Sequence, residues 1–390
     1  MAKGFQAAAV SAGIKKNGKK DLALIVSDAP AAVAGVFTRN RVQAAPVVLD
    51  RQRLAGGTCR AIIANSGNAN CATKQQGIAD AVAMTRSVSD ALEADPQHVM
   101  AASTGVIGVP LPVDKILSAV PDLVAALDPD GFADAAEGIM TTDTKAKLVR
   151  RQEKIDGQSF QITAMAKGAG MIRPDMATML CFVCTDIDMD APSLQQALAY
   201  ANERSFNRIT IDGDTSTNDT VLVMANGRSG AAARTPEQKD VFSGLLAGGL
   251  EELARKIVAD GEGATKCVEI AVINAHNEKA ARQAADTVAN SNLVKTAFYG
   301  EDANWGRILA ALGRAGVEFD PERVDIWFGD VRMVENGAGC GDQTEAAATQ
   351  VLRNEEFSVF IDLKSGTARA SVLTCDFSVD YVKINADYRS

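Results

Sequence analysis

The stretch Lys167-Gly-Ala-Gly-Met-Ile-Arg-Pro-Asp-Met-Ala-Thr-Met-Leu180 lies between two β-like runs and holds the candidate nucleophile of the chain. Its glycines allow close approach of the backbone. The small residue Ala177 precedes Thr178 and leaves room for the threonine hydroxyl to reach the preceding carbonyl carbon. An ordinary glycine turn between two strands fits the same residues, and composition alone favours that interpretation.

A nucleophile needs a base, and the chain contains only two histidines, His98 and His276. Neither lies near a Ser or Cys with nucleophile-elbow spacing, so a Ser-His or Cys-His enzyme is disfavoured. A threonine whose own backbone amine acts as base is the alternative. A free α-amine has a pKa of about 7.7–8.0 and suits proton transfer near neutral pH. This chemistry requires that the peptide bond before Thr178 be cut.

Composition restricts the class of protein. A chain of 390 residues with 47% hydrophobic and 23% charged residues should form two or three packed units. Its net charge of −9 disfavours nucleic acid as a partner. We expect a solvated hairpin tip at the four lysines around an Asn-Gly turn, Lys15, Lys16, Lys19 and Lys20. No apolar run reaches the ~18–20 residues of a membrane span, and no signal peptide is evident. We therefore expect a cytoplasmic protein of bacterial type without a membrane partner.

The seven cysteines indicate reduced thiols rather than a disulfide framework. Cys181 and Cys184 form a CxxC within an apolar run, where strand packing is the expected role. Zinc would need two further ligands that the sequence does not supply, so we predict no metal.

Hydrophobic periodicity predicts strands and helices throughout, without the strict βαβ alternation of a doubly wound sheet. The predicted strands are 22–26, 32–37, 60–64, 324–328, 356–363 and 368–377, with a glycine-rich turn at 65–70. The predicted helices are 75–94, 192–204, one starting at the Thr-Pro-Glu-Gln box of 235–238, 277–290 and 305–314. Asp156-Gly157 predicts a hairpin. We expect an α/β (α+β) fold with layered mixed or antiparallel sheets, and domains at 1–275 and 276–390.

Short blocks along the whole chain resemble, in order, those of the ornithine acetyltransferase family of arginine biosynthesis, whose members are self-processing N-terminal-nucleophile enzymes. One block, Lys167 to Leu180, matches the family's cleavage motif. The others are Gly4-Phe, 12–16, 34–41, 65–71, 103–108, 140–144, 212–219, 260–266, 299–307 and 381–390. Ala169, Arg173 and Asp175 depart from the pattern, which puts cleavage rate and fine substrate contacts in question but leaves the Ala177–Thr178 bond and Lys167 in place.

The resemblance implies a fold similar to that of the self-processing aminopeptidases, cleavage between Ala177 and Thr178, and acetyl transfer from N-acetylornithine to glutamate through Thr178. It places an oxyanion hole at Thr104 and Gly105. The implied substrate-binding residues are Thr144 (with Thr141 and Thr142 as rivals), Lys167, Thr178, Glu262, Asn385 and Ser390. The C-terminal tail would then return to the active site. A heterotetramer of two α and two β chains is expected, with no cofactor, and acetyl-CoA is a candidate second donor.

Two alternatives stay open. An amidase or aminopeptidase could use the same N-terminal threonine and release its product to water. A magnesium-dependent phosphohydrolase could use Asp212, which forms an acidic cluster with Asp214 and Asp219. We interpret that cluster as a hydrogen-bonded turn that supports the site. No phosphate-binding loop of the GxxxxGK[ST] type and no Rossmann glycine triplet is present, so no nucleotide cofactor is implied.

Overall fold

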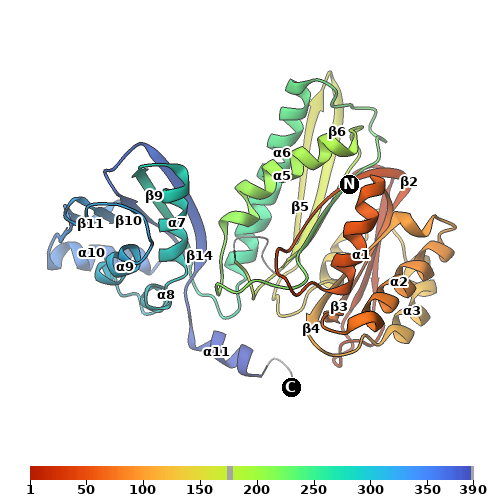
Figure 1. Cartoon of the computed structure of the whole chain (residues 1–390), viewed down its shortest axis with the longest axis horizontal. Coiled ribbons are helices and arrows are strands. Elements are labelled where there is room, and N and C mark those ends of the chain that lie inside the picture. The colour runs from red at the N-terminus through yellow and green to blue at the C-terminus, as the bar shows by residue number, and fades with distance from the viewer. Residues whose placement is uncertain (174–178, 388–390) are drawn as a thin grey trace. The chain divides into compact units, whose positions relative to one another are not determined.

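The computed structural model of the chain describes residues 1–173 and 179–387. It divides into two compact units (Figure 1). Unit 1 comprises 1–207 and 214–257, and unit 2 comprises 208–213 and 258–390. The boundary thus lies at 257/258, whereas we placed it at 275/276. The difference arises because β9 (Cys267–Ala275) pairs with two later strands of unit 2.

Unit 1 is built on a mixed eight-stranded sheet. Its strand order is β4-β3-β2-β8-β7-β6-β5, and β1 pairs with β2. The β3–β4 and β7–β8 pairs are parallel and the rest antiparallel. The strands are β1 (Phe5–Val10), β2 (Leu22–Phe37), β3 (Thr58–Asn68), β4 (Val99–Val106), β5 (Lys147–Ile155), β6 (Gln158–Lys167), β7 (Leu180–Thr185) and β8 (Thr220–Ala225). The predicted mixed pairing is confirmed.

Strand β2 corrects one prediction, because the two strands expected at 22–26 and 32–37 form a single strand of 16 residues. Its first part pairs with β1 and β3, and its last part pairs with β8, after a register shift between Val26 and Ala31. Successive side chains point to opposite faces. Leu24 therefore joins one hydrophobic core and Ile25 another, so the middle of the sheet is buried on both faces.

Helices cover this sheet. They are α1 (Ala45–Arg53), α2 (Lys74–Ala91), α3 (Val113–Ala125), α4 (Phe132–Gly138), α5 (Ala191–Arg204) and α6 (Pro236–Ala259). Single 3₁₀ turns lie at Leu54–Gly56, Pro96–His98 and Phe206–Arg208. Helices α2 and α3 pack side by side, and α6 runs along β5 and β6, where Phe242 meets Phe160 at 6.1 Å between ring centroids (Figure 1). Within 1–173 and 179–387, no helix is both long and apolar enough to cross a membrane.

Unit 2 holds a six-stranded sheet in the order β12-β11-β10-β13-β9-β14. Besides β9, its strands are β10 (Asp325–Phe328), β11 (Val331–Glu335), β12 (Ala338–Gly339), β13 (Glu356–Asp362) and β14 (Ala368–Cys375). Its helices are α7 (Glu278–Ala289), α8 (Asn292–Tyr299), α9 (Trp305–Gly313), α10 (Asp342–Leu352) and α11 (Val379–Ala386), with a 3₁₀ turn at Pro321–Arg323. The predicted helices near 277–290 and 305–314 and the predicted C-terminal strands are confirmed.

One local prediction is also confirmed, at a turn where the residue types dictate the backbone. Asp156 and Gly157 join β5 to β6 with φ of 49° and 80°, the left-handed pair that a two-residue hairpin needs. The glycine-rich turn predicted at 65–70 is wrong for residues 65–68, because the strand predicted at 60–64 continues as β3 to Asn68 and pairs there with β4.

Replacing Thr235 with alanine should lower the free energy of unfolding by about 1 kcal/mol. The Thr235 hydroxyl accepts a hydrogen bond from the amide of Gln238 (3.3 Å), and the Gln238 side chain accepts one from the amide of Thr235 (2.9 Å). This reciprocal capping box starts α6. Urea unfolding measures the loss, with Ser118→Ala on the exposed side of α3 as a control that should change stability by less than about 0.5 kcal/mol. Equal stability of both variants would contradict the assigned cap.

Candidate active site

The end of strand β6 brings Lys167 next to the start of β7. Lys167 pairs with Leu180, and Leu180 pairs with Thr220 at the start of β8, so the three residues form one row across the sheet. Ala177 and Thr178, the predicted cleavage site, lie outside the described residues. Leu180 is two positions after Thr178 in the sequence. The strand register therefore places a lysine opposite the chain that leads out of the predicted nucleophile.

Lys167 is only 3% exposed, and its ammonium group contacts two hydroxyls and lies near one carboxylate. Its Nζ donates hydrogen bonds to the hydroxyls of Thr141 (2.8 Å) and Thr104 (3.2 Å). The carboxylate of Asp143 lies 3.9 Å from Nζ. The buried ammonium group of Lys167 is thus held by two hydroxyls, and the nearest carboxylate oxygen given for it lies beyond direct hydrogen-bond distance.

Asp143 holds this arrangement in place. Its carboxylate accepts a hydrogen bond from Nζ of Lys147 (2.7 Å) and another from the amide of Gly168 (2.7 Å). Burial by itself would raise the pKa of Asp143, but the charges of Lys167 and Lys147 together with these hydrogen bonds lower it to about 2. Asp143 is therefore ionised at neutral pH and partly balances two buried lysines.

Thr104 and Gly105, the predicted oxyanion hole, are the sixth and seventh residues of β4 rather than part of a turn. Gly105 has φ of 134°, and a Cβ there would lie 2.3 Å from the carbonyl carbon of Gly67 on β3. Only glycine fits this contact. The close approach of β3 and β4 and the hydrogen bond from Lys167 fix the place of the Thr104 hydroxyl.

Among the three threonines weighed for substrate binding, the structure joins Thr141 to Lys167. Thr144 is exposed and Thr142 is partly buried. Asp143 and Lys147 had no individual role in the sequence analysis, and Thr141 was considered only as a rival of Thr144. The hydrogen bond from Lys167 marks Thr141 as the threonine of this block in the buried cluster.

Asp219 anchors the first described residue after the cleavage site. Its Oδ1 accepts a hydrogen bond from the amide of Met179 (2.9 Å), and the Met179 carbonyl accepts one from the amide of Thr220 (3.0 Å). Asp219 is fully buried. This agrees with our interpretation of the acidic segment as a turn that supports the site.

Unit 2 brings Glu262 and Asn385 together, two of the predicted substrate-binding residues. The side-chain amide of Asn385 on α11 donates a hydrogen bond to the Glu262 carboxylate (2.8 Å). Ser378 caps α11 and donates to the carbonyl of Gly263, which holds the helix against the 260–266 segment. Ser390 lies outside the described residues. The packing within unit 2 thus places a carboxylate and an amide, far apart in sequence, in direct contact.

The prediction that four lysines form a solvated hairpin tip is wrong for Lys15. The connection between β1 and β2 does carry them, but Lys15 is partly buried and its Nζ donates to the carbonyl of Lys20 (2.8 Å). Burial lowers the pKa of Lys15 to about 8 against the opposing charge of Asp21, and the charge of Lys167 lowers it further. The charge of Lys167 thus acts on Lys15, which links Lys15 electrostatically to the buried cluster.

The structure gives no support to the metal and thiol alternatives. Within the described ranges 1–173 and 179–387, no group of three His, Cys, Asp or Glu side chains could hold a metal ion. Asp212 and Asp219 belong to different compact units. All seven cysteines lie in the described ranges and none of them forms a disulfide bond there, and Cys181 and Cys184 are buried in β7, as predicted.

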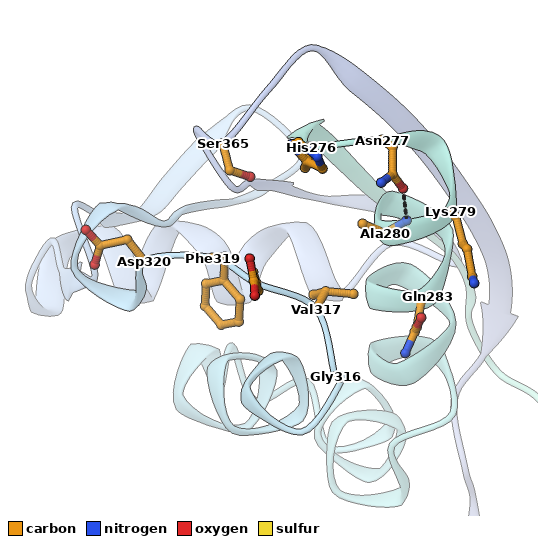
Figure 2. A pocket seen from close by; sticks show the side chains of 11 residues that line it. His276, Asn277, Lys279, Ala280, Gln283, Gly316, Val317, Phe319, Asp320 and Ser365 are labelled. Carbon is orange, nitrogen blue, oxygen red and sulfur yellow. Dashed lines mark hydrogen bonds between the residues drawn. The ribbon is translucent and has the colours of Figure 1, made fainter.

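A pocket of about 610 Å³ in unit 2 contains His276 but lacks a serine nucleophile in a suitable position (Figure 2). Ser365 lines the same pocket, yet its hydroxyl donates to the carbonyl of Asn274 (3.3 Å). Asn277, also in this wall, caps α7 through the amide of Ala280 (Figure 2). A Ser-His mechanism at His276 therefore has no support from this geometry.

The fold and the buried Lys–Thr cluster at the ends of β4 and β6 define a two-unit mixed α/β enzyme, and comparisons with known proteins specify its family. The ArgJ family model matches residues 6–390. The chain therefore belongs to the ArgJ family. The arginine biosynthesis bifunctional protein ArgJ of Geobacter sulfurreducens is 52% identical over 390 residues, covering 100% of this chain and 99% of that protein. The protein of the same name from Desulfotalea psychrophila is 52% identical over 391 residues, covering 100% and 99%.

A solved structure agrees with this assignment. The arginine biosynthesis bifunctional protein ArgJ of Bacillus halodurans aligns with a TM-score of 0.50 and 39% identity, covering 53% of this chain and 97% of that one. The resemblance inferred from the sequence, to an acyltransferase family of arginine biosynthesis, is thereby confirmed, together with the mixed α/β fold class.

Proposed function

We propose that this chain cuts itself between Ala177 and Thr178 and then carries an acetyl group on Thr178. The Thr178 hydroxyl first attacks the Ala177 carbonyl, and water releases two chains, residues 1–177 and 178–390. The freed α-amine then takes the proton from the hydroxyl, which accepts acetyl from N-acetylornithine, releases ornithine and passes acetyl to glutamate. No cofactor is required, because the acetyl group moves between two amines through one threonine ester.

The observation that carries this proposal is the pairing of Lys167 with Leu180 while Lys167 donates to the Thr104 hydroxyl (3.2 Å). It brings the predicted oxyanion-hole residue into the neighbourhood of the strand that starts just after Thr178. Hydrogen-bond donors near an acyl nucleophile can stabilise the negative oxygen of its tetrahedral intermediate. We assign that role to the Thr104 hydroxyl and the Gly105 amide.

Each unit holds polar groups that suit one kind of charged group found in the substrates. Lys167 suits a carboxylate, and the Glu262 carboxylate, held by Asn385, suits an ammonium group. Thr144 and Ser390 would supply further neutral hydrogen bonds at a site to which the C-terminal tail returns. We also propose that the two cut chains stay together, since β6 and β7 pair across the cut. The heterotetramer and the location in the cytoplasm stay proposals taken from the family resemblance.

The test is an intact-mass spectrum of the purified protein beside an assay of acetyl transfer from N-acetylornithine to glutamate. We expect two chains, the second beginning at Thr178, and stoichiometric formation of ornithine and N-acetylglutamate. A single uncut and active chain would overturn the proposal. Release of acetate to water without transfer to glutamate would instead indicate an amidase.

Replacing Lys167 with methionine should lower kcat/KM for N-acetylornithine by about 100-fold, corresponding to about 2.7 kcal/mol. Methionine has a similar length, so it fills the space but removes the charge that would bind a carboxylate. Steady-state kinetics of the cut protein measures the effect. Lys154→Met, at an exposed position of β5, is the matched control and should behave as the parent. Equal kinetics of both variants would remove Lys167 from the substrate site.

A further inference from the structure

Self-cleavage needs a base that the mature enzyme does not need. Before the cut, the nitrogen of Thr178 is part of a peptide bond and cannot accept the proton of its hydroxyl. The two histidines have other surroundings: His98 ends a 3₁₀ turn just before β4, and His276 lines a pocket with Ser365. The buried carboxylates of unit 1 are the other candidates for this base.

Asp219 is bound to the residue that follows Thr178. Its Oδ1 accepts the amide hydrogen of Met179 at 2.9 Å, and Thr38 donates its amide hydrogen to the Asp219 carbonyl at 3.0 Å. Asp219 is 0% exposed. Both its backbone and one side-chain oxygen are thus fixed relative to the start of β7.

The second oxygen of this carboxyl, Oδ2, is buried and has no hydrogen-bond partner. The neighbouring hydroxyl of Thr38 does not fill that role, because it donates its hydrogen to the carbonyl of Ser216 (2.6 Å). A buried polar atom without a partner is unusual and calls for a functional explanation. A proton-accepting role supplies one, since a free oxygen is what such a role requires.

The electrostatic surroundings suit a base. Burial raises the pKa of Asp219 well above its ordinary value, and the Met179 amide, Thr38 and the charge of Lys167 only partly oppose that rise. Lys167 on β6 is the charged side chain that acts on this carboxyl, and the contacts from β7 and from Thr38 are neutral. A carboxylate with a raised pKa accepts a proton from a hydroxyl more readily than an exposed one.

Covalent geometry brings the reacting hydroxyl within range. In any threonine, the hydroxyl oxygen stays within about 5 Å of the amide nitrogen of the next residue, whatever its rotamer. For Thr178 that nitrogen belongs to Met179, which lies 2.9 Å from Oδ1 of Asp219. Covalent geometry alone therefore limits the distance between the Thr178 hydroxyl and that carboxyl oxygen to about 8 Å.

We propose that Asp219 is the general base of self-cleavage. Its Oδ2 takes the proton of the Thr178 hydroxyl while the hydroxyl oxygen bonds to the carbonyl carbon of Ala177. The same proton then passes to the Thr178 nitrogen as the carbon–nitrogen bond breaks and an ester forms. Water hydrolyses that ester, which frees the carboxyl group of Ala177. This assignment rests on the proposed function and adds a residue for the processing step.

The experiment follows cleavage of the full chain made in a cell-free system, as the fraction cut against time on a gel. Asp219→Asn keeps an oxygen for the Met179 amide but cannot accept the proton, and its cleavage should be at least about 100-fold slower. Asp219→Glu restores a carboxyl and should cut faster than Asp219→Asn. The matched control is Asp50→Asn, because Asp50 is also fully buried, accepts a backbone amide (Ala101, 2.9 Å) and has an unpartnered Oδ2.

The pH profile separates a base from a structural role. Cleavage of the parent should rise with pH and level off above the raised pKa of Asp219, and Asp219→Asn should lose that plateau. A parent rate that stays constant from pH 4 to 9 would overturn the inference even if Asp219→Asn failed to fold, because a base whose pKa is raised gains activity as it loses its proton. The inference would also be overturned if Asp219→Asn and Asp50→Asn were both cut at the rate of the parent chain. A parent that is never cut would instead overturn the proposed function, and this inference with it.

Discussion

Thr178→Ala is expected to leave the chain uncut and acetyl transfer at background, a loss of at least about 10⁴-fold in kcat. Alanine has neither the hydroxyl that attacks Ala177 nor the one that carries acetyl. Lys167 would still donate to Thr141 and Thr104, since the substitution changes neither of these partners. Intact mass and the transfer assay on the same preparation measure both effects.

Thr178→Ser supplies the control for this prediction. Serine keeps a hydroxyl and, once the bond is cut, an α-amine, so the chain should still be processed and should retain measurable transfer. An active Thr178→Ala chain would exclude Thr178 as the acyl carrier. Acetyl transfer would then have to use another nucleophile, with His98 or His276 as the candidate base.

Local signals in the sequence predicted much of the fold because they act over a few residues. The Asp156-Gly157 hairpin and the Thr235 capping box depend on backbone conformation and on neighbours within four positions. The length of β2 could not be predicted in this way. Whether two apolar runs form one strand depends on β8 and β3 pairing with it, and those strands come much later in the chain.

The residues of the candidate site also differ in whether the sequence could predict them. Lys167, Thr104 and Gly105 were found through motifs that resemble a family, and the structure brings Lys167 and Thr104 together. Lys147 had no such signal, because a lysine at the start of a strand with an alternating pattern reads as a surface residue. Its burial at 2% exposure follows from the position of Asp143, which depends on tertiary packing.

For Asp219, the sequence pattern indicated a polar site but did not specify the role of the carboxylate. The segment 212–219 reads as an acidic cluster, for which a metal site was one interpretation. The division into two units separates Asp212 from Asp219, and the hydrogen bond to Met179 assigns Asp219 to the cleavage segment. Whether Asp219 acts as a metal ligand or as a base depends on which atoms face its Oδ2. A sequence pattern cannot predict those contacts.

Asp143→Asn is expected to lower the free energy of unfolding by about 3–5 kcal/mol at pH 7. Asparagine keeps the shape but removes the charge that balances Lys147, which lies 2.7 Å away and is 2% exposed. An unbalanced ammonium group would then stay buried beside Lys167. Urea unfolding of the two proteins measures the difference. Asp28→Asn, in an exposed ion pair with Arg228 (2.8 Å), is the control and should cost less than about 1 kcal/mol.

Acid should remove this difference, and the sign follows from the pKa of Asp143. Since folding lowers that pKa to about 2, against about 3.9 for an unfolded aspartate, the contribution is complete above pH 4 and is lost as the pH falls towards 2. The gap between the parent and Asp143→Asn should therefore be constant from pH 7 to 5 and narrow below pH 4. Adding Lys147→Met to Asp143→Asn should restore part of the stability, because methionine carries no charge to balance. A double variant no more stable than Asp143→Asn, or a gap independent of pH, would show that the Asp143–Lys147 ion pair does not stabilise the cluster.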